Sequence, residues 1–306
     1  MRSLATSPLG VLFSLSLLSL TLSCVAAQTI SLPTGKDLTA LLARMNDNRK
    51  ANDKVAQQYT SVMLWLNRNF NKSGKTTVDE SKKYENVFVE GLPYSRLIEL
   101  NGKPLEGKAA EEEQKRYDKT VEERKKMSLD EKRHSLHADF HFALPMGYLT
   151  SLFDNAAVRR EDVNGRETIV VESTPRSDAR PKDTDAKTAL DWKQTTWIDV
   201  QDEMPVRFIA EKLNDDNHDL KGTTMQFDFV RLVDQAAVGA PSGHPVWLEK
   251  GFKSMFRVKM MFMTFNGITE QTWDDFKKFH VDVRLLLDTM TEVEKEKPAA
   301  SRAQNP

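Results

Sequence analysis

Three histidines and an aspartate lie within eight positions of the chain, and their chemistry is that of metal ligands. They are His134, His137, Asp139 and His141. Imidazole and carboxylate groups both bind zinc. In a helix the three histidines would share one face, whereas in a strand the shared face would space its ligands too widely to chelate one ion easily. No HExxH pattern adds a catalytic base beside them. Chance surface histidines are the simpler interpretation, and we predict no metal site.

Nucleophilic catalysis has no support in the sequence. There is no GxSxG, P-loop or GxGxxG pattern. The sole cysteine, Cys24, lies in the N-terminal segment where it is expected to be removed or lipidated, so the mature chain offers no reactive thiol. The acid pairs Asp215/Asp216 and Asp274/Asp275 are adjacent, and adjacent side chains of a strand point to opposite faces. We therefore predict no catalytic residue, no cofactor and no enzymatic activity.

The first 27 residues read as an export signal. Arg2 supplies a positive start, residues 9–22 form an apolar run, and Val25, Ala26 and Ala27 are small residues ahead of a cleavage point. This order is typical of a secretory signal peptide cleaved after Ala27. The run is shorter than the about 20 residues of a transmembrane helix, and no second run follows. The mature protein is expected in a bacterial periplasm, without a transmembrane span.

Cys24 offers an alternative to cleavage after Ala27. It follows Ser23, as in a lipobox, but Thr21 stands where that motif usually has leucine. Lipid anchoring at Cys24 is therefore the less favoured interpretation. Under either interpretation the exported domain has no disulfide, so its apolar core must hold it together.

Composition describes a soluble globular domain with no electrostatic signature for nucleic acid. The chain has 44 basic and 45 acidic residues, a net charge of -1, and 39% hydrophobic residues. No linker rich in proline, glycine or serine divides it. We expect one β-rich domain over residues 28–291, a charged helical insertion at about 106–134, and a disordered tail over 292–306.

The spacing of apolar residues along the chain predicts the remaining helices and strands. A helix capped by Thr34 should bury Leu38, Leu41, Leu42, Met45 and Val55, and a strand from Tyr59 should be covered on both faces. Strands to Val89 and over 93–100 follow. The charged helix of residues 106–134 should be solvated and break near Ser128.

The second half should form an antiparallel series. Asn164-Gly165 predicts a hairpin between strands 158–162 and 168–174, and a second hairpin joins 195–200 to 205–213. A polar loop is expected over 175–187, and strands over 225–233 and 252–264. Gly267 is expected to mark a turn before a last strand over 276–287.

Two sets of apolar residues could form a ligand site. The first follows Pro145 on one helical face and would be either core or a lid: Tyr148, Leu149, Leu152 and Phe153. The second lines strand faces that must curve around a helix, or around a helix and an apolar ligand. These candidates for a lipid wall, each of which could equally be an ordinary core residue, are Phe208, Phe227, Phe229, Phe256, Met260 and Phe262.

Several segments, in their order along the chain, resemble a known family. They are the strand start Tyr59-Thr60, residues 97–105 (LIELNGKPL), residues 163–166 (VNGR), residues 172–176 (ESTPR), and residues 196–202 (TWIDVQD) followed by 205–207 (PVR). Together they resemble the exported lipoprotein-sorting and lipoprotein-carrier superfamily (LolA/LolB/RseB-like), particularly its large bacterial branch. The Trp197-Ile198-Asp199 segment is the most specific part of the resemblance.

The resemblance implies an α+β fold, mostly antiparallel β, in which helices plug or lid the open side of a curved, incomplete barrel. It also implies a periplasmic binding or carrier protein that holds acyl chains of a lipoprotein or another lipid. The alternative is an envelope protein-interaction or lipid-sensing module without a carrier role, with a protein partner. A metal-dependent hydrolase built on the histidine cluster comes third. A shared fold does not by itself decide among these.

Overall fold

The structure is a computed structural model that describes residues 31–70, 76–132, 135, 145–215, 221–233, 245–260 and 263–278. The expected signal peptide, Cys24, the histidine cluster, Phe262 and the expected tail lie outside these ranges. Within them, no group of three histidine, cysteine or acidic side chains is placed to hold a metal ion. The helices in these ranges are also too short or too polar to cross a membrane.

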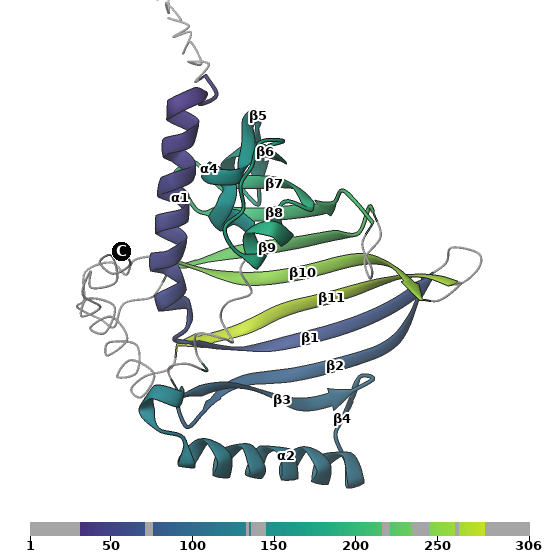
Figure 1. Cartoon of the computed structure of the whole chain (residues 1–306). Coiled ribbons are helices and arrows are strands. Elements are labelled where there is room, and N and C mark those ends of the chain that lie inside the picture. Colours follow the sequence, from purple (N-terminus) through teal and green to yellow (C-terminus); the bar gives the residue numbers. More distant parts are fainter. Residues whose placement is uncertain are drawn as a thin grey trace, which may run out of the picture. The chain divides into compact units, whose positions relative to one another are not determined.

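The strands form one 11-stranded sheet in the order β4-β3-β2-β1-β11-β10-β9-β8-β7-β6-β5, with every pairing antiparallel (Figure 1). Their bounds are β1 Tyr59–Phe70, β2 Thr76–Val89, β3 Leu92–Leu100, β4 Lys103–Pro104, β5 Phe153–Val163, β6 Arg166–Pro175, β7 Trp192–Asp199, β8 Pro205–Lys212, β9 Thr224–Val233, β10 Pro245–Met260 and β11 Met263–Lys278. The sheet is open, with β4 and β5 at its edges, which confirms the predicted fold class.

The helices with their bounds are α1 Gly35–Ala56, α2 Gly107–Lys126, the 3-10 turn η1 Pro145–Tyr148, α4 Leu149–Leu152 and α5 Thr184–Ala189. Helix α1 follows the predicted pattern: Leu38, Leu41, Leu42 and Met45 are buried. Two details differ from the prediction. The Thr34 side chain makes no capping hydrogen bond, and Val55 is exposed.

The pairing of β1 with β11 joins the first strand of the chain to its last described one, while all other neighbours in the sheet follow sequence order. Three predictions about this region are wrong. The strand expected over 252–264 belongs to two strands, Gly267 lies inside β11 rather than in a turn, and no separate strand starts at Phe276. Glycine at position 267 suits a strand here because the Phe256 ring packs over it: a Cβ would lie 2.2 Å from that ring.

Two further expectations need correction. The segment expected as a polar loop contains α5, because the Asp183 carboxylate accepts a hydrogen bond from the backbone N–H of Ala186 and caps the helix. Strand β1 is not covered on both faces, since Leu64 is exposed. The break near Ser128 is confirmed: α2 ends at Lys126, and Ser128 and Glu131 exchange hydrogen bonds in a capping box.

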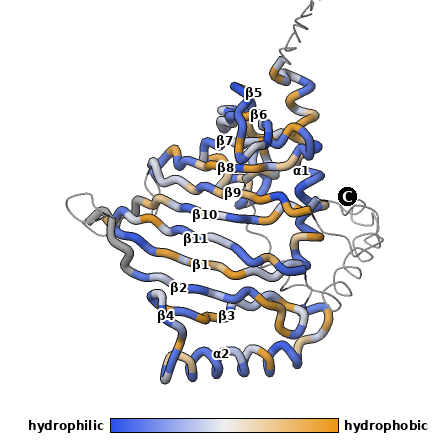
Figure 2. Tube along the Cα trace, turned by 180° about the vertical axis from the view of Figure 1, so that it is seen from behind, coloured by the Kyte–Doolittle hydropathy of each residue, from blue (hydrophilic) through white to orange (hydrophobic). Residues whose placement is uncertain are grey.

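The main core lies on one face of β6 to β9, beneath α1, α4 and α5. It contains Phe208, Phe227, Ile198 and Val171 from the strands, together with the four buried residues of α1. A second, smaller cluster surrounds Trp197 and Trp247. Hydrophobic and hydrophilic residues alternate along the long strands, whereas α2 is largely hydrophilic (Figure 2). The main core therefore lies on one face of the sheet, which we call the inner face, while Val170 and Trp197 of the second cluster lie on the opposite face.

Candidate functional site

Polar contacts, beside the buried apolar residues of helix α1, fix this helix over the sheet. Arg44 donates two hydrogen bonds to the Glu203 carboxylate, each 2.8 Å long. One and two turns further on, the Asn48 amide reaches the carbonyl oxygen of Asp202, and the Asn52 amide pairs with both backbone groups of Trp247 at 2.7 Å. These contacts position α1 over the turn between β7 and β8 and over the start of β10.

That turn is held by the segment that carries the sequence resemblance. Asp199 is almost fully buried and accepts a bidentate pair of hydrogen bonds from the Arg166 guanidinium, while Asp202 accepts from Arg231 and from the Trp247 indole. Burial alone would raise the pKa of Asp199, but the hydrogen bonds from Arg166 and from the Asp202 backbone outweigh it and lower this pKa. The network is structural: it fixes the hairpin on which α1 rests.

Three aromatic rings cross the inner face in register. Phe208 in β8 is the register partner of Phe227 in β9, which is the partner of Phe252 in β10. The ring centroids are 6.3 Å apart for the first pair and 4.8 Å for the second. The line continues through Gln271 in β11 to Trp65 in β1. We call Phe208, Phe227 and Phe252 the aromatic row.

Burial changes along this line. Phe208 is fully buried under α1, Phe227 is 6% exposed, and Phe252 and Trp65 are only partly buried. On the inner face of β1, β2, β10 and β11 the partly buried apolar and aromatic side chains form what we call the open face: Met63, Trp65, Tyr84, Phe252, Phe256 and Trp273. The apolar surface of the core thus continues onto strands that α1 does not bury.

The opposite face of the same strands mixes charged pairs with aliphatic side chains such as Leu66 and Ile268. Glu270 forms ion pairs there with Arg68 at 2.9 Å and Lys253 at 3.2 Å. Leu64 and Met255 are the large hydrophobic residues exposed on this face in the described part of β1 and β10. The inner face differs from the opposite one in its aromatic side chains, which only Gln271 separates between Phe252 and Trp65.

The structure places the predicted wall residues as follows. Phe208 and Phe227 stand in the aromatic row, Phe256 packs over Gly267, and Phe229 contacts both core clusters. Met260 pairs in register with Met263 at the end of β10, and its side chain is not described. Phe262 lies outside the described residues.

The predicted lid residues do not share one helical face. Only Leu149 and Leu152 lie in α4, while Tyr148 ends η1 and Phe153 begins β5. All four nevertheless pack against the α1 core cluster. The Tyr148 hydroxyl donates to Asp183 at 3.1 Å; burial and this carboxylate raise the pKa of Tyr148. The segment is tied to α5 as well as to α1.

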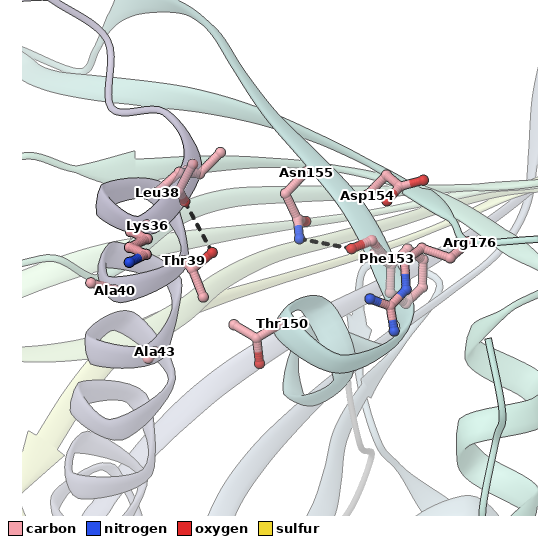
Figure 3. Close-up of a pocket in the computed structure, with 11 residues that line it drawn as sticks. Lys36, Leu38, Thr39, Ala40, Ala43, Thr150, Phe153, Asp154, Asn155 and Arg176 are labelled. Atoms are coloured by element: carbon pink, nitrogen blue, oxygen red, sulfur yellow. Dashed lines mark hydrogen bonds between the residues drawn. The ribbon is translucent and has the colours of Figure 1, made fainter. Parts of the chain in front are cut away.

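An open groove of about 650 Å³ runs between the first half of α1 and the start of β5 (Figure 3). Small α1 residues such as Ala40 and Ala43 line one side, and Phe153, Asn155 and Arg176 line the other. The charges along it are mixed, because Lys36, Asp154 and Arg176 all contribute. The groove borders the inner face at its β5 edge.

Of the open face, sequence reasoning predicted only Phe256 as a wall residue. Phe252 begins the strand expected over 252–264 but is not among the predicted wall residues, and Met63 and Trp65 belong to the strand expected to be covered on both faces. The alternation of β1 carried the signal for Trp65. What it lacked was the pairing with β11, which decides that Trp65 follows Phe252 across the sheet.

No protein-family model and no curated protein matches the chain. Among solved structures, it is similar to a domain from Vibrio parahaemolyticus described as an outer membrane lipoprotein-sorting protein, with 10% identity, a TM-score of 0.37, and coverage of 81% of this chain and 98% of that one. A LolA superfamily protein from Nitrosomonas europaea, NE2245, has 9% identity, a TM-score of 0.27 and coverage of 78% and 96%.

A third similar structure is the MucA/MucB complex of Pseudomonas aeruginosa, with 10% identity, a TM-score of 0.23 and coverage of 80% of this chain and 100% of that one.

Proposed function

We propose that the chain is an exported, non-enzymatic binding or carrier protein that holds an acyl chain of a lipoprotein or another lipid on the inner face of its sheet. The observation that carries the proposal is the open face. It continues the apolar core from the aromatic row to Met63 and Trp65, yet its side chains are only partly buried. Contiguous, partly exposed apolar surface of this kind marks a binding site.

The energetics favour a chain-like apolar ligand. Each CH₂ group removed from water contributes about 0.8 kcal/mol, so contact along several strands gives a useful affinity without any charged anchor. Neighbouring strands are about 4.8 Å apart, and the line from Phe208 to Trp65 crosses five strands, β8, β9, β10, β11 and β1. Phe208 and Phe227 are buried in the core, so the accessible part of this line runs from Phe252 to Trp65, a span of roughly 10 Å that a segment of an extended chain can cover.

Trp65 and Leu64 provide a matched pair for testing this proposal. They are adjacent in β1 but point to different faces, Trp65 to the open face and Leu64 to the opposite one. Trp65→Gln should weaken binding of a fluorescent acyl probe by about tenfold or more, because a large aromatic contact area is lost. Leu64→Gln should leave binding within about twofold, since surface substitutions away from a site have small effects.

Both variants would be measured by probe titration and by native mass spectrometry of the protein isolated with its lipids. Circular dichroism and thermal unfolding would verify that each variant is folded. Equal loss of binding in both variants, or no binding by the parent chain, would contradict the proposal. The open face would then be a surface for another kind of partner.

A further inference from the structure

Two polar side chains are sealed inside the apolar core without hydrogen-bond partners. Gln194 and Thr196 stand two residues apart in β7 on the inner face, and each is 0% exposed. Neither the amide oxygen nor the amide nitrogen of Gln194 is hydrogen-bonded to any part of the chain that the structure describes, and the same holds for the Thr196 hydroxyl. Three buried polar atoms are therefore unsatisfied at one place.

Such groups are costly, and the surroundings explain why these two find no partner. Leaving a buried amide or hydroxyl unpaired costs about 1–3 kcal/mol. The register partners in β8 are Ala210 opposite Gln194 and Phe208 opposite Thr196, and neither has a polar side chain. A core selected only for packing would carry apolar residues at both positions.

The neighbouring polar side chains show what a satisfied arrangement looks like. Ser173, the register partner of Gln194 in β6, is also fully buried, but its hydroxyl donates to the Asn155 amide oxygen at 2.6 Å. Asn155 in turn donates to the carbonyl oxygens of Leu149 and Phe153. Asn155 also lines the open groove beside α1. A polar row of Asn155, Ser173 and Gln194 thus leads from the groove into the core, and it ends at the unsatisfied amide.

We infer that Gln194 and Thr196 form a hydrogen-bonding site for the carbonyl group of the acyl ligand, an inference that rests on the proposed function. The Gln194 amide N–H and the Thr196 hydroxyl are donors that a carbonyl oxygen can accept from. Thr196 is in register with Phe208, the first ring of the aromatic row. Because Gln194, Thr196 and Phe208 are each 0% exposed, α1 would have to move aside for a carbonyl to reach this place, and the hydrocarbon tail would then follow the row toward Phe252 and the open face.

The inference is tested by two probes that differ only in the carbonyl group: a long-chain fatty-acid methyl ester and an alkane of the same length. Each would compete with a fluorescent acyl probe on the full chain and on Gln194→Leu, a substitution of similar size. The ester should bind about tenfold more weakly to the variant, a factor that corresponds to about 1.4 kcal/mol. The alkane should bind to both proteins equally.

Thr196→Val is the second variant, and it keeps the test valid if Gln194→Leu does not fold. It should weaken the ester alone, by a smaller factor. Thr195→Val is the matched control, because Thr195 lies between the two residues on the opposite face and should change neither probe.

The outcomes separate the two ideas. If both probes bind and the variants leave the ester unchanged, as for an amide satisfied by a trapped water, the carbonyl site is wrong while the carrier function stands. Weakening of ester and alkane by the same factor would likewise overturn it, as a general effect of packing. If neither probe binds the parent chain, the proposed function itself fails.

Discussion

Glu249 is the carboxylate in the described part of the chain whose pKa is raised, and burial is the cause. It lies in β10, in register with Phe229, and is partly buried. Removal from water raises the pKa of its carboxyl from 4.5 to about 7. Between these two values the folded state holds a proton that the unfolded state has lost. The resulting stability is fully present below pH 4.5 and is lost as the pH rises through 7.

We predict that the free energy of unfolding falls on the order of 1–3 kcal/mol between pH 5 and pH 8 because of this one carboxyl. Glu249→Gln removes the titration and should flatten that part of the profile. Urea unfolding of both proteins at several pH values measures the difference. Parallel profiles for the parent and the variant would show that Glu249 is ionised in the folded state.

At the scale of the element, α2 is part of the fold rather than a free charged arm. Glu113 is 8% exposed and accepts hydrogen bonds from the Tyr94 hydroxyl, the Leu97 backbone N–H and the Arg116 guanidinium. Burial, together with the bond to Glu113, raises the pKa of Tyr94 to about 12. Arg124 adds hydrogen bonds to backbone carbonyls of β2 and β3. Deleting α2 would therefore destabilise the neighbouring β2 and β3.

Glu113→Ala should loosen α2 by about 2–3 kcal/mol, because the bonds to Tyr94 and Leu97 are lost from a buried site. Glu112→Ala is the adjacent control and should cost almost nothing, since its side chain is 64% exposed and its ion pair with Lys108 lies in solvent. Hydrogen exchange of the α2 amides measures both effects. Equal protection in the two variants would mean that apolar contacts alone hold the helix.

In the whole molecule, the pairing of β1 with β11 assembles the sheet face to which a ligand would bind. The aromatic row comes from β8, β9 and β10, and Trp65 comes from the other end of the described chain, so unfolding disperses them. A ligand that binds only this assembled face must stabilise the fold by mass action.

The melting temperature should therefore rise with acyl-ligand concentration. The free energy of unfolding should increase by about 2.7 kcal/mol when the ligand concentration is a hundred times the dissociation constant. Trp65→Gln should need a correspondingly higher concentration for the same rise, whereas Leu64→Gln should follow the parent chain. Differential scanning calorimetry over a ligand series measures this. Retention of lipid without any rise in melting temperature would place the ligand outside the assembled face.

Much of the local structure could be read from the sequence because its causes are local. The Asn164-Gly165 turn, the buried stripe of α1 and the break near Ser128 follow from turn chemistry, helical period and capping. The wrong predictions concern residues whose environment depends on contacts with residues distant in sequence. Gly267 was expected in a turn, but it lies in a strand under the Phe256 ring. Leu64 was expected to be covered, but no element covers its face of the sheet in the described part of the chain and it is exposed.

Residue patterns predicted an antiparallel, β-rich chain and several of the aromatic side chains on its inner face. The folded structure was needed to show that Trp65 follows Phe252 across the sheet, and that Gln194 and Thr196 are buried without partners in the part of the chain it describes. Strand alternation assigns each residue to a face, whereas cross-strand register depends on how the whole sheet buries its apolar surface. A candidate ligand site built across β7 to β1 therefore leaves no linear motif.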